Sequence, residues 1–446
     1  MATIAIEKGR LLLGEHLTRS NILVENGEIK SISRTKLSQV DKRIDASGKI
    51  VLPGLVDGHA HLHDPAFENR ENFTSGSRAA AAGGVTTVID MVLSTPVDTL
   101  ERVKAKIAAG ESRSLIDFSL HAGMMNLANL QNISSITTAG VRSFKTFTCK
   151  PYYVDDHTLM SLMRETTSHR SILDVHAEDE EIADANFRRL VAEGRIDPLA
   201  HLEWKPNIAE ERAVRKIVDF ARQMRARLHI SHLSTAEAVL IVRRAKTLKV
   251  KVTAETCPHY LTLTRRDMKK LGPYLKMNPS LKGPKDASAL WNGLRSGAVD
   301  IVTSEHAPGE RPEKEVGWHD IWKAWGGVPS IETMLPLLLS EGVNKGRISL
   351  AILQRVCCTN PAKIFGLYPR KGHIEAGADA DLVIVDPKMR KKVRAEELHY
   401  KVGWTPYEGK TLKGWPILTM LRGNIICEDG VIMKDPGDAQ FVPMSL

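Results

Sequence analysis

The sequence predicts an α/β fold in which a (β/α)₈ (TIM) barrel is combined with a small β-sandwich domain built from both chain ends. Two observations support the barrel: apolar strand-like runs alternate with helix-length segments in the middle of the chain, and eight such runs occur. Short strands separated by turns near both termini support the β-sandwich. A chain of 446 residues is long enough to form both units.

Short strands with turns fill the first fifty residues. We expect strands at 4–6, 22–24 and 29–32, with the turn Glu25-Asn26-Gly27-Glu28 before the last one, because Asn-Gly between apolar residues is a strong hairpin signal. The same pattern of short apolar strands and turns occurs again at 380–387 and 421–430. The sequence therefore predicts that residues 1–52 and 376–446 form the β-sandwich and that residues 53–375 form the barrel.

Eight apolar runs are expected to form the barrel strands. They are 50–56, 85–92, 116–121, 141–148, 171–176, 227–232, 250–256 and 299–304. Helices are expected between them, for example at 74–82, 208–225 and 235–245. Eight repeats across about 320 residues suit a barrel, whose typical size is roughly 250 residues with insertions tolerated.

The composition excludes several classes of protein. The five cysteines, at 149, 257, 357, 358 and 427, have neither disulfide-framework nor zinc-finger spacing, which indicates reduced thiols and a cytoplasmic location. The N-terminal segment lacks a secretion signal and no run of 18 apolar residues occurs, so we expect no membrane association. The net charge of +9 is scattered rather than gathered into a stripe with aromatic residues, so we expect no nucleic-acid partner.

Candidate metal ligands fall at the C-terminal ends of the predicted strands, where barrels of this kind place their chemistry. His59 and His61 end the first run, and two residues spaced in this way on a strand point to the same face. His176 ends the fifth run, His232 ends the sixth and Glu305 follows the eighth. Imidazole and carboxylate ligands suit zinc first, and also manganese, iron or cobalt.

A lysine, Lys145, lies inside the fourth apolar run. An ammonium without a partner beside metal cations is strongly unfavourable, so we expect a neutral amine that reacts with carbon dioxide to give a carbamate bridging two metals. Two cations about 3.5–4 Å apart can share a water, lower its pKa and polarise a carbonyl group. Glu305 would ligate one metal, accept a proton from the water and pass it to the leaving nitrogen.

Each candidate also has a simpler explanation when it is taken alone. Lys145 can extend from a strand edge into solvent, His176 can cap a helix or bind a core carbonyl, and Glu305 can be a solvated loop carboxylate. His229, on the same run as His232, is an alternative to it. The common position at one end of the barrel favours the metal site. Histidines elsewhere, in helical or loop segments, are expected to face solvent, for example His157, His169, His319 and His399.

Longer motifs surround these residues. They are Pro53-Gly54-Leu55-Val56-Asp57-Gly58-His59-Ala60-His61, the Ala- and Gly-rich segment 76–87, Phe144-Lys145, His176-Ala177-Glu178, His232-Leu233-Ser234, Glu255-Thr256-Cys257-Pro258-His259-Tyr260, Thr359-Asn360-Pro361-Ala362-Lys363 and Gly377-Ala378-Asp379-Ala380-Asp381-Leu382-Val383. Over essentially its full length the chain resembles the cyclic amidohydrolases of the amidohydrolase superfamily, which are hydantoinases, dihydropyrimidinases, allantoinases and dihydroorotases.

The resemblance implies a centre of two divalent metal ions, zinc first. His59 and His61 would bind one ion, His176 and His232 the other, and carbamylated Lys145 would lie between them. It also implies a small cyclic amide as the substrate and a homotetramer or homodimer as the assembly.

One position departs from the family pattern. Where the family has an aspartate before His-Ala-Pro, this chain has Glu305-His306-Ala307-Pro308. Glutamate keeps the charge but adds a methylene, and catalytic groups tolerate little displacement. Because the other ligand positions are retained, we expect an active hydrolase, with a non-catalytic scaffold on the same fold as the alternative.

The predicted reaction is the opening of the ring amide of a cyclic ureide or imide. Dihydroorotase-like sequences carry an arginine two residues after the second metal histidine and an asparagine after the second strand, where this chain has His63 and Val92-Leu93-Ser94. The segment 90–96 is closer to allantoinases, and 315–325 and 342–347 are similar to hydantoinases. We therefore expect a hydantoinase- or allantoinase-like enzyme with His63 at the substrate, and keep dihydroorotase as the alternative.

Two further substrate contacts are expected. D-type hydantoinases have a tyrosine five residues after the carbamylated lysine that holds the developing oxyanion; here Lys150 has that place, and Tyr152 and Tyr153 follow. We select Tyr152, although any of the three can stabilise the intermediate and the tyrosines can instead pack the loop. Asn278 is expected at the amide edge of the ring, or else is an ordinary turn residue before Pro279.

Overall fold

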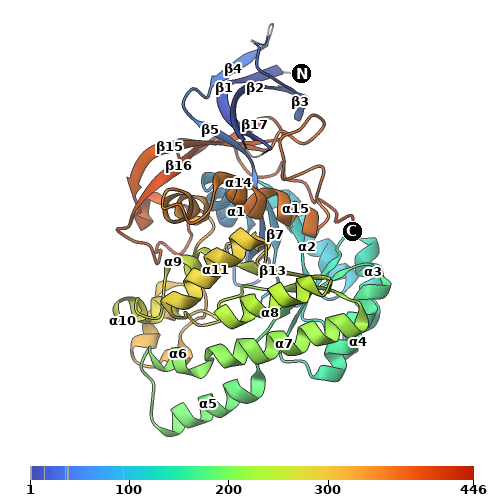
Figure 1. The fold of residues 1–446 in the computed structure, drawn as a ribbon, viewed down its shortest axis with the longest axis vertical. Coiled ribbons are helices and arrows are strands. Elements are labelled where there is room, and N and C mark those ends of the chain that lie inside the picture. Colours follow the sequence, from blue (N-terminus) through green and yellow to red (C-terminus); the bar gives the residue numbers. More distant parts are fainter. Residues whose placement is uncertain (1–2, 15, 36, 38–39, 94) are drawn as a thin grey trace.

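The structure is a computed structural model that describes residues 3–14, 16–35, 37, 40–93 and 95–446. Ser94, in the stretch compared above with dihydroorotases, lies outside the described residues. Figure 1 shows a sheet-rich part at one end of the molecule, containing the first segment of the chain together with strands from late in the chain, and a larger part where helices cover the strands; the C-terminus lies beside the larger part.

One nine-stranded sheet combines strands from both chain ends. Its order is β18-β17-β16-β15-β5-β1-β2-β3, and β4 also pairs with β1. The strands are β1 (Thr3–Leu13), β2 (His16–Glu25), β3 (Glu28–Ser33), β4 (Lys42–Asp45), β5 (Ile50–Pro53), β15 (Leu382–Lys392), β16 (Thr411–Leu421), β17 (Asn424–Glu428) and β18 (Val431–Ile432). Because β5 pairs with both β1 and β15, it joins the N-terminal and C-terminal parts, which confirms the shared β unit.

The hairpin of β2 and β3 forms where the Asn-Gly signal predicts it. Strands β2 and β3 are antiparallel, and Asn26 and Gly27 between them have φ values of 56° and 84°. A two-residue turn with both φ values positive matches the right-handed twist of the strands, and Asn and Gly tolerate this conformation best. The local sequence therefore sets the register of this edge of the sheet.

Eight strand positions form the barrel, and their neighbours pair in parallel. They are β6 (Leu55–Ala60), β7 (Val85–Asp90), β8 (Asp117–Leu120) continued by β9 (Ala122–Gly123), β10 (Ser143–Phe147), β11 (Ile172–His176), β12 (Arg227–Ile230), β13 (Val252–Thr256) and β14 (Ile301–Val302). A parallel bridge between Ala60 and His306 links the last strand position to the first. The expected (β/α)₈ barrel is confirmed.

The expectation for the first barrel run, 50–56, is wrong in part. Residues Ile50–Pro53 form β5 in the mixed sheet, and the barrel strand β6 begins at Leu55. Both strands are buried on both faces, so one continuous apolar run does not reveal that it divides between two sheets. Gly54 lies between them, and a Cβ atom there would collide with the side chain of Thr86. The division into 1–52, 53–375 and 376–446 stays a prediction.

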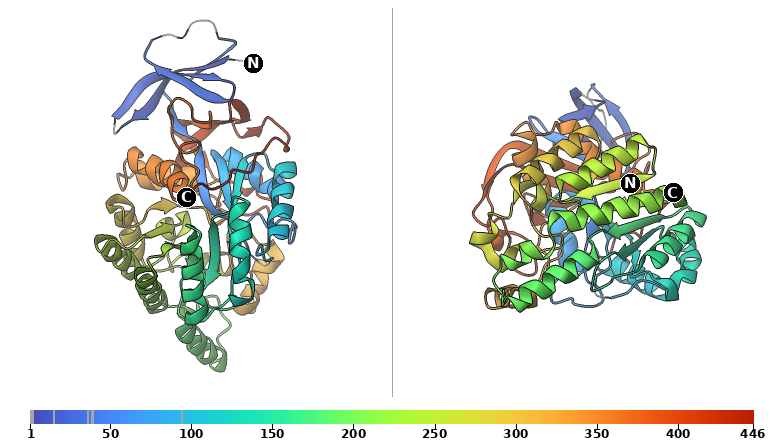
Figure 2. Two further views of the ribbon diagram at one scale, coloured as in Figure 1. Left: turned by 90° about the vertical axis from the view of Figure 1, so that its right-hand side faces the viewer. Right: turned by 60° about the horizontal axis from the view of Figure 1, so that its bottom comes forward.

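Helices cover the barrel strands, as the views in Figure 2 show. The three expected helices are present as α1 (Phe73–Ala82), α7 (Asn207–Met224) and α8 (Ala236–Thr247). Asn72 and Thr235 cap the first turns of α1 and α8 with their side chains. The other helices are α2 (Leu100–Arg113), α3 (Ile133–Thr138), α4 (Asp156–Ser168), α5 (Glu180–Ala192), α6 (Ala200–Trp204), α9 (Pro258–Thr262), α10 (Met268–Leu271), α11 (Pro284–Ser296), α12 (Arg311–Glu315), α13 (Met334–Leu337), α14 (Leu350–Gln354) and α15 (Asn360–Ile364).

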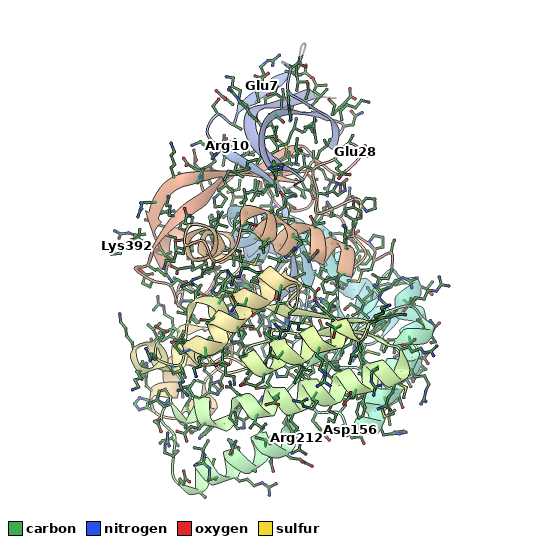
Figure 3. All side chains as sticks on the ribbon, in the orientation of Figure 1. Glu7, Arg10, Glu28, Asp156, Arg212 and Lys392 are labelled. Atoms are coloured by element: carbon green, nitrogen blue, oxygen red, sulfur yellow. The ribbon has the colours of Figure 1, made fainter. Side chains whose placement is uncertain are left out.

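Charged side chains are spread over the outer faces of both units, as Figure 3 shows. Arg212, labelled there on α7, donates to Glu181 on α5 over 2.8 Å and so ties two outer helices together. Across the described ranges, no helix combines the length and the apolar character needed to cross a membrane.

Candidate metal centre

The six predicted metal ligands meet around one cavity at the C-terminal ends of the barrel strands. The cavity measures about 90 Å³, and its walls include His59, His61, Lys145, His176, His232 and Glu305. These residues come from five different strand ends, yet all six are at most 7 % exposed. The fold thus converts a set of scattered sequence positions into one buried group of nitrogen and oxygen atoms.

His59 and His61 present their rings from the end of β6. Nδ1 of His59 lies 2.5 Å from Glu255 Oε1, and Nδ1 of His61 lies 2.9 Å from the carbonyl oxygen of Met91. Each imidazole is oriented through Nδ1, which leaves Nε2 free to coordinate a cation. Together with Glu305 the two histidines place ligand atoms within 4.8 Å of one another.

His176 and His232 form a second pair from the ends of β11 and β12. Nε2 of His176 lies 2.7 Å from Glu178 Oε2, while its Nδ1 lies 3.0 Å from His232 Nε2. Burial opposes the charged form of His176, but Cys149 and Glu178 raise its pKa to about 9, whereas burial and His176 hold the pKa of His232 well below its usual value. Two ring nitrogens that face each other at this distance can bind one cation between them.

Lys145 is the residue whose environment differs most from the expectation. Its side chain is 1 % exposed on β10, so it does not extend into solvent. Its Nζ lies 3.0 Å from Asp174 Oδ1 and also contacts Ser231 Oγ. The assumption that this ammonium has no partner is therefore wrong, because a paired buried charge is far less costly than an isolated one. The case for a carbamate depends on the resemblance and on the shared cavity.

Glu305 lies just after β14 and is 7 % exposed, so it is not a solvated loop carboxylate. Its backbone N–H donates to the carbonyl oxygen of His59 over 2.8 Å, and its φ is 44°, in the left-handed region. The carboxylate lies near the His59 and His61 pair on one side and near His259 on the other, with Oε2 3.3 Å from His259 Nε2. The longer side chain of glutamate is thus accommodated between two histidine groups.

The three candidate oxyanion donors, Lys150, Tyr152 and Tyr153, have different surroundings in the structure. Tyr152 lines the cavity with its ring 5.1 Å from that of Phe147. Tyr153 is 46 % exposed. Lys150 also borders the cavity, but its ammonium lies 2.9 Å from Glu180 and 3.2 Å from Asp184 on its outer side. Tyr152 is therefore the best placed of the three.

The other two expected substrate residues lie in different places. Asn278 lines the same cavity, and within the described chain its buried Oδ1 has no hydrogen-bond partner. His63 instead borders an adjoining cavity of about 100 Å³, with its ring packed against Trp325. Burial, together with Arg70 and Lys106, lowers the pKa of His63 to about 3, so its imidazole is neutral.

The other histidines considered from the sequence lie outside the cavity. His229 is buried but bonds to Thr253 and Glu255 below the cavity, so the choice of His232 over it agrees with the geometry. The four histidines expected at the surface are exposed or partly exposed. No role is predicted from the sequence for Glu178, Asp174, Glu255 or His259, although Asp174 and Glu255 are acidic residues inside buried strands, which is a usable signal.

The donor set fits divalent cations. Three histidines are each oriented by an acceptor on one ring nitrogen, and Nδ1 of His176 faces Nε2 of His232 over 3.0 Å. An imidazole that is held through one ring nitrogen offers the lone pair of the other to a cation. Imidazole nitrogens and carboxylate oxygens are the ligands expected for zinc and similar ions.

A separate cluster of three carboxylates is paired with basic side chains rather than with histidines. Asp117, Asp379 and Asp381 place oxygen atoms within 4.8 Å of one another, at the start of β8 and beside the mixed sheet. The ammonium of Lys371 lies 2.6 to 2.8 Å from all three, and Arg422 also contacts Asp117. We call these five residues the junction cluster. Its own two cations offset most of the charge of the three carboxylates, and Arg370 also contacts Asp379, so it requires no metal ion.

Comparison with known proteins gives consistent results along the whole chain. A sequence profile of the amidohydrolase family matches residues 50–426. The chain is 34 % identical over 450 residues to an L-hydantoinase of Paenarthrobacter aurescens, covering 99 % of this chain and 98 % of that protein. It is 35 % identical to a dihydroorotase of Methanosarcina acetivorans (99 % and 96 % covered) and 34 % identical to an allantoinase of Rubrobacter xylanophilus (94 % and 92 % covered).

The fold comparison agrees. The crystal structure of the L-hydantoinase (dihydropyrimidinase) from Arthrobacter aurescens superimposes with a TM-score of 0.96 at 34 % identity, covering 99 % of this chain and all of that chain.

Proposed function

This chain belongs to the amidohydrolase family and is a cyclic amidohydrolase, an enzyme that hydrolyses C–N bonds in cyclic amides; from this premise we propose that it opens the ring of hydantoin- or allantoin-type ureides. The observation that carries the proposal is the convergence of four histidines, Lys145 and Glu305 on one cavity. Three of those histidines are oriented from behind by Glu255, Glu178 and a backbone carbonyl.

The family is metal-dependent, and we propose two divalent ions, zinc first, at this site. His59 and His61 would hold one, His176 and His232 the other, with Glu305 on one ion and carbamylated Lys145 between them. Such ions, when bound, activate water and polarise a carbonyl group. The mass of the intact protein, recorded under mild conditions, tests the carbamate: one added carbon dioxide that disappears in Lys145→Ala is expected.

The chain's own residues supply the proton transfer and the substrate contacts. Glu305 lies at the cavity wall in reach of the His59 and His61 pair, and is placed to take a proton from the attacking water and deliver it to the departing ring nitrogen. Tyr152, which lines the cavity, would donate a hydrogen bond to the oxygen that becomes negative. The unpaired Oδ1 of Asn278 is available to accept a ring N–H.

The choice of ring follows from charge. Dihydroorotate carries a carboxylate, and the place where similar sequences hold an arginine for it contains His63, whose imidazole is neutral. A neutral imidazole gives no charge-assisted bond to a carboxylate, and such bonds are roughly twice as strong as neutral ones. The cations beside His63 are already paired, Arg70 with Glu313 and Lys106 with Asp90, so this place favours an uncharged ring, although relatives named dihydroorotase are as similar in sequence as the others.

A panel of rings tests the proposal. Purified protein loaded with zinc, cobalt or manganese is given hydantoin, allantoin, dihydrouracil, a cyclic imide and dihydroorotate, while metal content is measured in parallel. We expect turnover of hydantoin or allantoin and at least tenfold less of dihydroorotate. Absence of ring opening in metal-replete protein would refute the proposal, and a preference for dihydroorotate would replace it with the dihydroorotase alternative.

We further propose that the protein is cytoplasmic and assembles as a homotetramer or homodimer. All five cysteines are unpaired thiols, which supports a reducing compartment. Light scattering on the purified chain tests the assembly, and a monomeric mass at micromolar concentration would contradict it.

A further inference from the structure

His259 is a buried histidine next to Glu305 for which no role has been described above. It is 0 % exposed, and over the described ranges neither of its ring nitrogens makes a hydrogen bond of good geometry. Oε2 of Glu305 is also buried without such a bond, and it lies 3.3 Å from His259 Nε2. Two unsatisfied buried polar groups this close satisfy one another after a small rotation, and each otherwise costs free energy.

The imidazole of His259 is fixed from two directions. It belongs to the first turn of α9, directly after β13, where Pro258 begins the helix. Its ring packs edge-on against Tyr260 at 4.3 Å, and the Tyr260 hydroxyl donates to the carbonyl oxygen of Pro279 over 2.7 Å. A ring held in this way is a rigid support for a neighbouring carboxylate.

The carboxylate of Glu305 participates in two buried groups at once. Its ligand atoms lie within 4.8 Å of those of His59 and His61, and likewise within 4.8 Å of those of Cys257 and His259. A glutamate side chain has one more rotatable bond than an aspartate, so its two oxygens need an additional support to remain in one orientation. A hydrogen bond at Oε2 leaves Oε1 available for the His59 and His61 side.

We propose that His259 is a positioning residue that holds Glu305 through Nε2 and Oε2, so that Oε1 keeps one orientation toward His59 and His61. The inference deepens the proposed function and rests on it for the role of Glu305 in proton transfer. The contact itself does not depend on which ring is opened.

A matched pair of substitutions tests the contact. Glutamine at 259 offers an amide N–H near the place of Nε2, whereas methionine has nearly the same length and volume without a donor. We expect H259M to lower kcat by about 10- to 100-fold with KM within about twofold, because loss of a partner behind a metal ligand typically has effects of that size. H259Q should recover most of kcat. Equal loss in both variants would overturn the proposal.

The length of the residue at 305 provides the second test. Aspartate at 305 is too short to reach His259 from the same backbone, so H259M should cost kcat much less in the E305D background than in the native one. Additive losses in the double variant would contradict the proposed contact, since residues that interact show coupling.

A spectroscopic readout separates this inference from the proposed function. The visible absorption of the cobalt-loaded protein reports the ligands of the ion whether or not any ring is opened. We expect H259M to alter the spectrum and H259Q to resemble the native protein. If no ring is opened but this pattern holds, the function fails and the contact stands; an unchanged spectrum in H259M refutes the contact. Where H259M does not fold, H259N, whose amide reaches only the place of Nδ1, is expected to behave in the same way.

Discussion

Two buried groups of ionisable side chains lie at opposite ends of the barrel strands, and they differ in how their charge is balanced. In the junction cluster, at the start of β8, Lys371 and Arg422 sit among three carboxylates. At the C-terminal strand ends, Glu255 and Glu178 orient His59 and His176, and among the described residues Glu305 contacts a histidine, His259, rather than a lysine or arginine. Both groups look like metal sites by residue type alone.

The difference shows that residue type does not define a metal site. A group whose carboxylates are paired with lysine and arginine side chains of the same chain needs no ligand and contributes to stability. A group of histidines that are oriented through one ring nitrogen can bind an ion through the other. The arrangement agrees with the general division of (β/α)₈ barrels, in which the C-terminal face carries chemistry and the N-terminal face stability. The predictions below test this division.

The largest expected effect is the loss of activity on removing the metal ions. Chelation, or His61→Asn, should lower ring-opening activity by about 10³-fold or more, because metal ions supply several kcal/mol of transition-state stabilisation. Elemental analysis and turnover are measured before and after zinc is restored. Restored zinc should rescue the chelated native protein and not the variant. Full turnover in metal-free protein would show that the histidine group at the C-terminal strand ends is not a catalytic metal site.

Lys371→Met should lower stability and leave activity unchanged, the opposite of metal removal. Leaving three buried carboxylates without their ammonium should lower the free energy of unfolding by about 3–5 kcal/mol, the usual cost of removing one partner of a buried ion pair. Urea unfolding measures the change, and Lys30→Met, which removes a surface ion pair with Glu25, is the control with little expected effect. Metal content and turnover per folded molecule should stay at the native level; loss of metal in Lys371→Met would show that the two groups are not independent.

The carboxylates behind the histidines give an intermediate effect. Glu255 contacts His59 Nδ1 at 2.5 Å and the backbone N–H of His232 at 3.1 Å, so it supports both halves of the site, while Glu178 supports only His176. We expect Glu255→Gln to weaken zinc binding by about 100-fold and Glu178→Gln by about 10-fold, the two ends of the usual range for such partners. Competition with a calibrated chelator measures both, and the reverse order would be inconsistent with this geometry.

The smallest expected effect is a pH dependence at the junction cluster. Burial opposes the charge of Asp117, but Lys371 and Arg422 keep its pKa below the usual 3.8. A depressed carboxyl pKa adds stability that is fully present above the unfolded pKa and is lost as the pH falls through the folded one. The stability difference between native and Asp117→Asn protein, both metal-free, should therefore be constant from pH 8 to about 5 and shrink below about 4. A difference that grows in acid would exclude this balance of charges.

Much of the fold and most of the ligand set follow from local patterns in the sequence. Alternation along a strand places His59 and His61 on one face, and the Asn26-Gly27 turn sets its hairpin. The supporting residues could not be found in this way. Glu255 reaches His59 only because barrel closure leaves a single strand, β14, between β13 and β6, and Asp174 meets Lys145 only through the register of β10 with β11. Register and closure depend on how all strands pack, which no single segment encodes.

The continuity of β5 and β6 through Gly54 has a practical consequence. Strand β6, which carries His59, directly continues β5, and β5 is paired on its two sides with β1 from the N-terminal part and β15 from the C-terminal part of the chain. We therefore expect deletion of β1 or β15 to disturb the anchorage of the strand that leads to His59. Engineering of this enzyme for expression should leave both terminal strands intact.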